Sequence, residues 1–214
     1  MLEDPIRVFF VDDHALFRGG MAALIANDPE FRAVGNSSGG PAVGDEIAES
    51  SPDVVVLDVG LQGFNGLDIC RSIMRKHPKM AVLMLTMHDD DVLVARALDY
   101  GASGYLLKES APDEFVRALR TVAKHELYLG PGISKDVVKK IGFARDEPYE
   151  SLTPRERQVL QLIVDGKTSR QIAATLDTAV KTVEMHRMHL MKKLDIHDQA
   201  TLVKYAIRKG LVKL

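Results

Sequence analysis

Five polar side chains that together could transfer a phosphoryl group follow short apolar runs in the first half of the chain. In chain order they are Asp12, Asp13, Asp58, Thr86 and Lys108. Carboxylates without cysteine or paired histidine suit a hard cation such as Mg²⁺, which prefers oxygen ligands. A bound cation would offset the repulsion between the carboxylates, so Asp58 could attack a phosphoryl group whose oxygens Thr86 and Lys108 hold. The alternative is that each is a solvated loop residue.

These side chains meet only if the apolar runs are strands of one sheet. Helical patterns alternate with strand-like runs, the helices near 17–25, 42–49, 67–76, 92–99 and 113–124 and the strands at 6–11, 31–35, 54–57, 81–85 and 104–107. Continuous apolar strands between helices indicate a parallel sheet covered on both faces. The pattern predicts an α/β, doubly wound, flavodoxin-like sheet of five strands in the order 2-1-3-4-5. Ligands bind such sheets at the carboxyl ends of the strands, where all five side chains would lie.

Residues 6–125 resemble the receiver domain of bacterial two-component response regulators. The resemblance is carried, in order and spacing, by Asp12-Asp13, the Val-Val-Val-Leu-Asp58 strand end, Gly66, Leu85-Thr86 and Leu107-Lys108. It implies that Asp58 accepts phosphate from a phosphohistidine on a sensor histidine kinase. It also implies a Mg²⁺ ion held by Asp12, Asp13, Asp58 and the backbone carbonyl of Gly60.

The resemblance assigns three further residues around the phosphoryl group. It implies that Thr86 engages the phosphoryl group and that Lys108 pairs with it. Tyr105 occupies the aromatic switch position, whose rotamer follows the threonine in this family. A plain core aromatic in the fifth strand is an equally open interpretation of Tyr105.

The chain departs from the receiver pattern at two places beside the phosphoacceptor. Leu61-Gln62 stands where the family has Met-Pro, and losing that proline frees the loop backbone because proline fixes φ and removes a donor. Met87 stands where a small residue is common. We expect Met87 to crowd the entry to Asp58 or, alternatively, to pack against the following helix.

Charge divides the chain into two parts. Residues 151–214 hold twelve Lys/Arg and six Asp/Glu, a balance of +6, whereas residues 1–150 hold sixteen basic and twenty-four acidic residues, a balance of −8. This asymmetry predicts a second domain with a polyanionic partner. We expect a receiver domain at 1–125, a linker with one short helix over 134–141 at 126–150, and the basic domain at 151–214.

The basic domain carries the signals of a helix-turn-helix. Thr153 to Glu156 has capping-box spacing with proline at the first helical position, and Gly166 is placed to end that helix. Thr168 to Gln171 is a second capping box two residues later. Two capped helices separated by so short a turn indicate helix-turn-helix geometry.

A third helix over 180–194 is expected to read DNA. Val183, Leu190 and Leu194 fall on the side that packs on the domain. The opposite face and its flanks carry Lys181, Thr182, Glu184, Met185, Met188, His189 and Lys192. Basic ends for phosphates and a mixed centre for base edges suit a major-groove helix. The alternative is an ordinary amphipathic helix with a solvated basic face.

Residues 151–211 resemble the LuxR-type four-helix DNA-binding domain. The resemblance runs through Leu152-Thr153-Pro154-Arg155-Glu156, Gln171-Ile172-Ala173, Lys181-Thr182-Val183, His186-Arg187, Lys192-Lys193-Leu194, Ala206-Ile207 and Gly210-Leu211. Ala179 replaces the serine that usually caps the reading helix. Either Thr178 caps the helix one residue early, or the missing cap costs about 1 kcal/mol. Glu184 stands where relatives often carry a base-reading or phosphate-binding residue. It can accept a hydrogen bond from cytosine N4 and so contribute specificity, or alternatively it simply repels phosphate.

Together the two halves resemble a NarL/FixJ-type response regulator. The resemblance implies a transcription factor that is phosphorylated on Asp58 by a sensor histidine kinase, uses Mg²⁺, forms a homodimer on activation and binds double-stranded promoter DNA. We expect the fourth helix of the basic domain to supply a dimer face through Leu202, Val203 and Ala206. The alternative is that these residues pack against the body of the domain. The receiver is expected to catalyse only its own phosphorylation and dephosphorylation, so the chain is not a conventional enzyme.

Three other functions compete with that of a phosphorylation-controlled response regulator. A haloacid dehalogenase-type hydrolase needs a second aspartate two residues after its nucleophile, where Gly60 stands. A flavin or nucleotide module needs a glycine- or hydroxyl-rich phosphate loop after the first strand, where Asp12 and Asp13 would repel phosphate without a metal. A phosphorylation-independent regulator with a degenerate receiver remains open, because Met87 and Gln62 are unusual.

Composition fits this interpretation. The chain is 46% hydrophobic and 27% charged, which is typical of globular domains. No apolar run approaches the ~20 residues that span a bilayer, and the acidic start lacks a secretory signal. Cys70 is the single cysteine, which excludes an internal disulfide. We therefore expect a cytoplasmic protein without a membrane partner.

Overall fold

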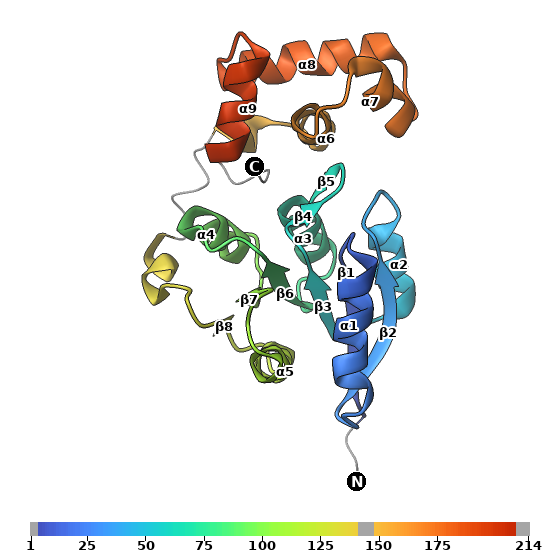
Figure 1. The fold of residues 1–214 in the computed structure, drawn as a ribbon, viewed down its shortest axis with the longest axis vertical. Coiled ribbons are helices and arrows are strands. Elements are labelled where there is room, and N and C mark those ends of the chain that lie inside the picture. Colours follow the sequence, from blue (N-terminus) through green and yellow to red (C-terminus); the bar gives the residue numbers. More distant parts are fainter. Residues whose placement is uncertain (1–3, 141–147, 209–214) are drawn as a thin grey trace.

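A computed structural model describes residues 4–140 and 148–208 and shows two parts (Figure 1). The first is a sheet with helices on both faces, and the second is a group of helices that lies beyond one end of the sheet. None of the described helices has the length and apolar character needed to cross a membrane. The two parts correspond to the acidic and basic halves of the sequence.

The sheet is parallel and has six strands in the order β2-β1-β3-β6-β7-β8. In chain order the strands are β1 (Ile6–Val11), β2 (Phe31–Ser37), β3 (Val54–Leu57), β6 (Ala81–Thr86), β7 (Gly104–Leu107) and β8 (Tyr128–Leu129). The predicted doubly wound order of the first five is confirmed. The sixth strand was not predicted, because two residues that pair with Gly104 and Tyr105 are too short to show a periodic pattern.

Five helices cover the two faces of the sheet. They are α1 (Ala15–Ala26), α2 (Val43–Ser50), α3 (Gly66–Lys76), α4 (Asp91–Asp99) and α5 (Pro112–Ala123). Alternate residues of β1 point to opposite faces, as strand geometry requires. Val8 and Phe10 pack in the core with α1 and α5, whereas Phe9 and Val11 pack in the core with α2, α3 and α4.

A small hairpin follows β3 and contains Leu61-Gln62, where the chain departs from the receiver pattern. β4 (Gly60–Leu61) and β5 (Phe64–Asn65) pair antiparallel around a turn in which Gly63 has a φ of +71°. Glycine adopts this backbone conformation without steric cost. A Cβ on Gly66, where α3 begins, would lie 1.8 Å from the carbonyl oxygen of Asp58. The close packing of α3 against the end of β3 therefore requires glycine at this position.

The connecting segment is partly described. A 3₁₀ helix, η1 (Lys135–Lys140), packs beside α4 where a short helix over 134–141 was expected, and residue 141 lies outside the described residues. Residues 148–208 then form η3 (Pro148–Ser151), α6 (Pro154–Val164), α7 (Ser169–Thr175), α8 (Val180–Leu194) and α9 (Gln199–Arg208). These elements share a separate apolar core.

The helix ends in the second domain follow the sequence signals closely. Both capping boxes form, with Thr153 and Thr168 accepting hydrogen bonds from the backbone of Glu156 and Gln171. Gly166 adopts a φ of +78° just after α6. The prediction that Thr178 caps α8 is wrong, since the N-cap is Ala179 and it makes no side-chain cap hydrogen bond.

Candidate functional site

Two carboxylates and one ammonium group meet at the carboxyl ends of β1, β3 and β7. Lys108 Nζ lies 2.6 Å from Asp58 Oδ2 and 2.6 Å from Asp12 Oδ2. The Asp12 and Asp58 side chains are 2% exposed and that of Lys108 is 6% exposed. Because a buried charge is costly unless it is paired, Lys108 stabilises both carboxylates, but one ammonium group offsets only one of the two negative charges. The predicted convergence of these three residues is confirmed.

The backbone fixes Asp58 within this crevice. Its N–H donates to the Val11 carbonyl at 2.9 Å, and its Oδ1 accepts from the Gly60 N–H at 3.3 Å. Burial raises the pKa of the Asp58 carboxyl, while the hydrogen bond and charge of Lys108 act to lower it. The Asp58 carboxyl is thus held in a fixed orientation, and its negative charge depends on its partners.

The acidic residues of the crevice also form a cluster that could hold a metal ion. Asp12, Asp13, His14 and Asp58 each place one ligand atom within 4.8 Å of the others. Three of these four groups are carboxylates, and that donor set fits a hard divalent cation. His14 was not predicted as a member, although it directly follows the acidic pair. Its Nδ1 lies 2.9 Å from Asp13 Oδ1.

Thr86 and Tyr105 meet around the loop that follows β6. Thr86 is fully buried, and its Oγ1 accepts a hydrogen bond from the His88 N–H at 3.3 Å. The Tyr105 hydroxyl donates to the His88 carbonyl at 2.9 Å. Burial raises the pKa of Tyr105, so its hydroxyl keeps its proton. Both residues hold the same loop, which leads into α4.

Met87 borders an open apolar groove between α1 and the start of α5. Its side chain is 56% exposed, and the groove of about 850 Å³ also includes Phe17 and Lys108. Packing of Met87 against the following helix stays an alternative prediction. The groove adjoins the crevice through Lys108, as expected for a residue at the entry to the site.

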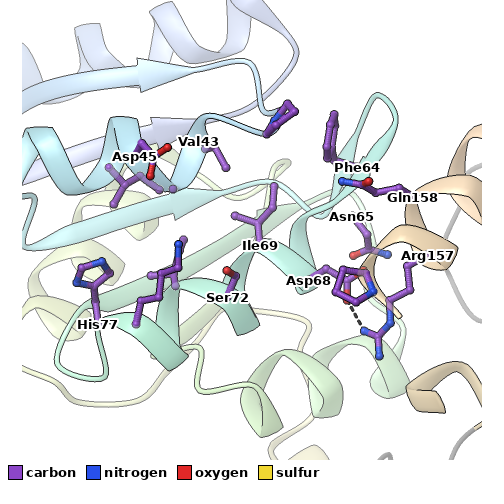
Figure 2. A pocket seen from close by; sticks show the side chains of 17 residues that line it. Val43, Asp45, Phe64, Asn65, Asp68, Ile69, Ser72, His77, Arg157 and Gln158 are labelled. Carbon is purple, nitrogen blue, oxygen red and sulfur yellow. Dashed lines mark hydrogen bonds and ion pairs between the residues drawn. The ribbon is translucent and has the colours of Figure 1, made fainter. Parts of the chain in front are cut away.

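A cluster of buried polar groups joins the two domains. Arg157 of α6 points at Asp68 of α3, and the two form an ion pair across a cleft of about 280 Å³ (Figure 2). Burial lowers the pKa of the Arg157 guanidinium, but the charge and hydrogen bond of Asp68, together with Tyr149 and Tyr100, raise it overall. Arg157 therefore stays charged and holds the first turn of α6 against the receiver domain.

Aromatic residues extend this cluster to α4. The ring of Tyr149 contacts two guanidinium groups. That of Arg157 lies 4.5 Å from the ring centre, and that of Arg96 of α4 lies 5.3 Å from it. The Tyr149 hydroxyl is 3.2 Å from Asp68 Oδ2. Glu150 accepts from Arg71 of α3 at 2.8 Å. The sequence does not predict these contacts, because single residues on separate elements, up to 81 positions apart, carry no shared sequence signal.

The hairpin after Asp58 makes a second contact between the domains. The Gly63 N–H donates to Asp165 Oδ2, at the end of α6, over 3.2 Å. Burial raises the pKa of the Asp165 carboxyl, which Gln161 and Gly63 act to lower. The departure at Leu61-Gln62 thus lies in a hairpin that contacts the second domain.

The structure places the predicted DNA-contact residues along one face of α8. Val183, Leu190 and Leu194 are buried against the domain, as predicted. Exposed side chains occupy the opposite face, namely Lys181, Glu184, Met185, Met188, His189 and Lys192, while Thr182 is half-buried. In Figure 1, α6 lies between α8 and the receiver domain. The receiver therefore leaves this face uncovered.

The predicted dimer face on α9 needs correction. Leu202 and Ala206 are 1% and 0% exposed because they fill the core of the second domain. Buried side chains of this kind cannot form an exposed interface. Val203 is half-buried and remains a prediction.

Comparison with known proteins matches both domains to families. The model of the response regulator receiver domain matches residues 8–120, and that of the bacterial regulatory proteins of the luxR family matches residues 150–206. The transcriptional regulatory protein DegU of Brevibacillus brevis is 33% identical over 99% of this chain and 97% of its own. The transcriptional regulatory protein MctR of Rhizobium johnstonii is 36% identical over 99% of this chain and 98% of its own.

The fold agrees with these relatives. A solved structure of the RcsB response regulator of Salmonella typhimurium has a TM-score of 0.63 at 21% identity, covering 97% of this chain and 99% of that one. Both domains are matched and the relatives are similar over their whole length. The chain therefore belongs to the NarL/FixJ family of response regulators, transcription regulators that join a receiver domain to a LuxR-type helix-turn-helix DNA-binding domain.

Proposed function

We propose that Asp58 accepts a phosphoryl group from a phosphohistidine of a sensor histidine kinase and thereby controls dimerisation and binding to promoter DNA. The observation that carries this proposal is the crevice itself. Lys108 Nζ lies 2.6 Å from both Asp12 and Asp58, and the carboxylate cluster is suited to a divalent cation. Phosphoryl transfer depends mainly on such positioning and charge neutralisation.

Each residue has a distinct part in the proposed transfer. An Asp58 oxygen attacks phosphorus as the P–N bond of the phosphohistidine breaks, and the released imidazole takes up a proton. Lys108 neutralises the negative charge that gathers on the oxygens, and Thr86 donates its hydroxyl to one of them. Mg²⁺, held by Asp12, Asp13, Asp58 and the Gly60 carbonyl, would supply further charge neutralisation.

The signal would leave the crevice through the loop after β6. Thr86 and Tyr105 both hold His88, so movement of Thr86 toward a phosphoryl group would change the position of this loop and of α4. Arg96 of α4 stacks on Tyr149 of the second domain, and the same ring also contacts Arg157 of α6. A shift of α4 would therefore loosen the contact between the domains.

The second domain would bind double-stranded DNA through α8. Its excess of basic residues and the exposed basic ends of the α8 face support a polyanionic partner. RcsB, which shares the fold, has been solved in complex with DNA. We place the protein in the cytoplasm, where a kinase and promoter DNA are both accessible.

A second candidate function is DNA binding without phosphorylation. It is favoured by the α8 face, which the receiver leaves uncovered in this structure (Figure 1). Under that function the receiver would hold the second domain in place but would not gate it.

One experiment separates the two functions. The protein is incubated with Mg²⁺ and a small phosphodonor such as acetyl phosphate, and its mass is measured. We expect a labile gain of one phosphoryl group that needs Mg²⁺ and is absent from Asp58→Asn. A label that persists in that variant would place the acceptor elsewhere, and the absence of any label would favour the second function.

A further inference from the structure

The exposed face of α8 has an apolar centre between basic ends. Met185 and Met188 are 44% and 61% exposed, although methionine is usually buried. Lys181 and Lys192, both exposed, stand on either side of the pair. Two solvent-exposed thioethers at the centre of a charged face gain stability only when something apolar covers them.

The rest of the domain holds this face in a fixed orientation. Val183 and Leu190 are fully buried in the domain core on the other side of α8. Arg187 contacts both neighbouring segments, with Nη1 3.4 Å from Ser169 Oγ at the start of α7 and Nη2 3.3 Å from Gln199 Oε1 at the start of α9. The methionines are therefore presented on a rigid element, as sequence recognition requires.

Charge identifies duplex DNA as the occupant of this face. Lys181 and Lys192 are eleven residues apart, which corresponds to about 16 Å along a helix. That separation is enough to reach phosphates on both sides of a major groove about 12 Å wide. A protein partner that buried the methionines would also have to cover both exposed lysines, which is costly without matching carboxylates.

The chemistry of the pair then restricts which bases it can contact. In the major groove only thymine presents a methyl group, while the other bases present hydrogen-bond donors and acceptors. A thioether is a weak acceptor and carries no donor, so it would leave those polar edges unsatisfied. Glu184, exposed beside Met185 and one turn before Met188, is an acceptor suited to the amino group of cytosine.

We propose that Met185 and Met188 select operator half-sites by contact with thymine 5-methyl groups, with Glu184 accepting a hydrogen bond from a neighbouring cytosine N4. This inference rests on the proposed function, because it names the bases that the same face reads. Burying one methyl group against a thioether should improve affinity about fourfold. The half-site is therefore expected to contain thymine next to cytosine at its centre.

The test removes single methyl groups from the DNA. The full-length protein, incubated with acetyl phosphate and Mg²⁺, first selects duplexes from a random pool. Each central thymine of the enriched half-site is then replaced by uracil, which lacks only the methyl group. We expect one such replacement to weaken binding of the wild-type protein about fourfold. The same replacement outside the half-site should have no effect.

Protein variants then assign the methyl contact to its side chain. In Met188→Ala or Met185→Ala the difference between thymine and uracil should disappear at one position, whereas Met188→Leu should keep it. Lys192→Ala serves as the control, because loss of a phosphate contact should weaken thymine and uracil duplexes equally. Thermal melts of the variants check that the domain stays folded.

The possible failures are distinguishable. An enriched half-site without thymine, or a thymine–uracil difference that survives in both alanine variants, would overturn this inference and leave DNA binding in place. A pool from which nothing is enriched would overturn the proposed DNA-binding function and this inference with it.

Discussion

The phosphoacceptor crevice and the exposed face of α8 use charge in opposite ways. In the crevice one lysine lies 2.6 Å from each of two carboxylates, and all three side chains are almost fully buried. On α8 the lysines at 181 and 192 are exposed. The crevice pairs its lysine inside the protein and keeps an excess of negative charge, so an added metal ion or phosphoryl group would change that balance. The lysines of the α8 face are exposed to solvent, so their charge is available to a binding partner.

The contact between the domains connects these two regions. It combines the ion pair between Arg157 and Asp68 with the hydrogen bond from Gly63 to Asp165. Gly63 lies in the hairpin that begins two residues after Asp58. The contact holds α6 and does not cover α8 (Figure 1). Control of DNA binding would therefore act on the orientation of the second domain.

The largest expected effect follows from removing the positive charge of Lys108 from the crevice. We predict that Lys108→Met slows phosphorylation from a small phosphodonor by about 100-fold, as expected when a preorganised charge stabiliser is lost. Two adjacent buried carboxylates would then repel each other, so Mg²⁺ should raise the melting temperature of the variant more than that of the wild type. Rapid-quench phosphorylation and thermal melts measure both effects. Lys124→Met, at an exposed lysine, is the control, and equal rates for the two variants would contradict this role of Lys108.

The next largest effect concerns the contact between the domains. We predict that Asp68→Ala shifts the equilibrium between docked and separated domains toward separation by about 2 kcal/mol. Breaking a buried ion pair usually costs ~3–5 kcal/mol, but here the loss is smaller because Glu150 still pairs with Arg157. The Gly63 amide should then exchange its hydrogen faster, and the radius of gyration in small-angle scattering should rise. Asp45→Ala, an exposed aspartate at the same cleft, is the matched control. Unchanged exchange at Gly63 would show that the ion pair does not hold the domains together.

A smaller effect is expected at the start of α8. Because α6 and α7 have capping boxes and α8 has an uncapped Ala179, we predict that Ala179→Ser stabilises the second domain by about 1 kcal/mol. Urea unfolding measures this change. Ala48→Ser, at an exposed position inside α2, should give no stabilisation. A loss of stability in Ala179→Ser would mean that the serine cannot reach the first turn.

The smallest effect is expected at the rim of the crevice. Met87 is exposed and borders the groove beside Lys108, so we predict that Met87→Ala speeds both phosphorylation from a small donor and loss of the phosphate by a few-fold. Dependence on Mg²⁺ should not change. Stopped-flow rates and a thermal melt are measured together. Unchanged rates with a lower melting temperature would show that Met87 only packs.

The crevice and the caps could be predicted from the sequence because each depends on local order. Asp58 and Lys108 directly follow apolar strands, and parallel strands bring their carboxyl ends to one edge. Thr153 and Thr168 each lie three residues before the side chain that completes a capping box. Such signals lie within one element or directly after it, so they can be recognised without knowledge of the tertiary structure.

The remaining features depend on contacts between distant segments. Arg157 and Asp68 are both ordinary helix residues in the sequence, and only the docking of α6 on α3 makes them partners. β8 is only two residues long, and its pairing with β7 is what makes it a strand. Leu202 and Ala206 belong to an apolar stripe, and such a stripe does not reveal whether its partner is the same chain or another. The structure shows that they pack within their own domain.

The central claim is that phosphate on Asp58 changes DNA binding. The most direct measurement is the affinity of the full-length protein for a selected duplex, with and without acetyl phosphate and Mg²⁺, in the wild type and in Asp58→Asn. We predict that the phosphodonor changes the affinity of the wild type by about tenfold, within the usual range of coupling between two sites, and leaves that of Asp58→Asn unchanged. Equal affinities in all four conditions would contradict the claim and identify a regulator that binds DNA without phosphorylation.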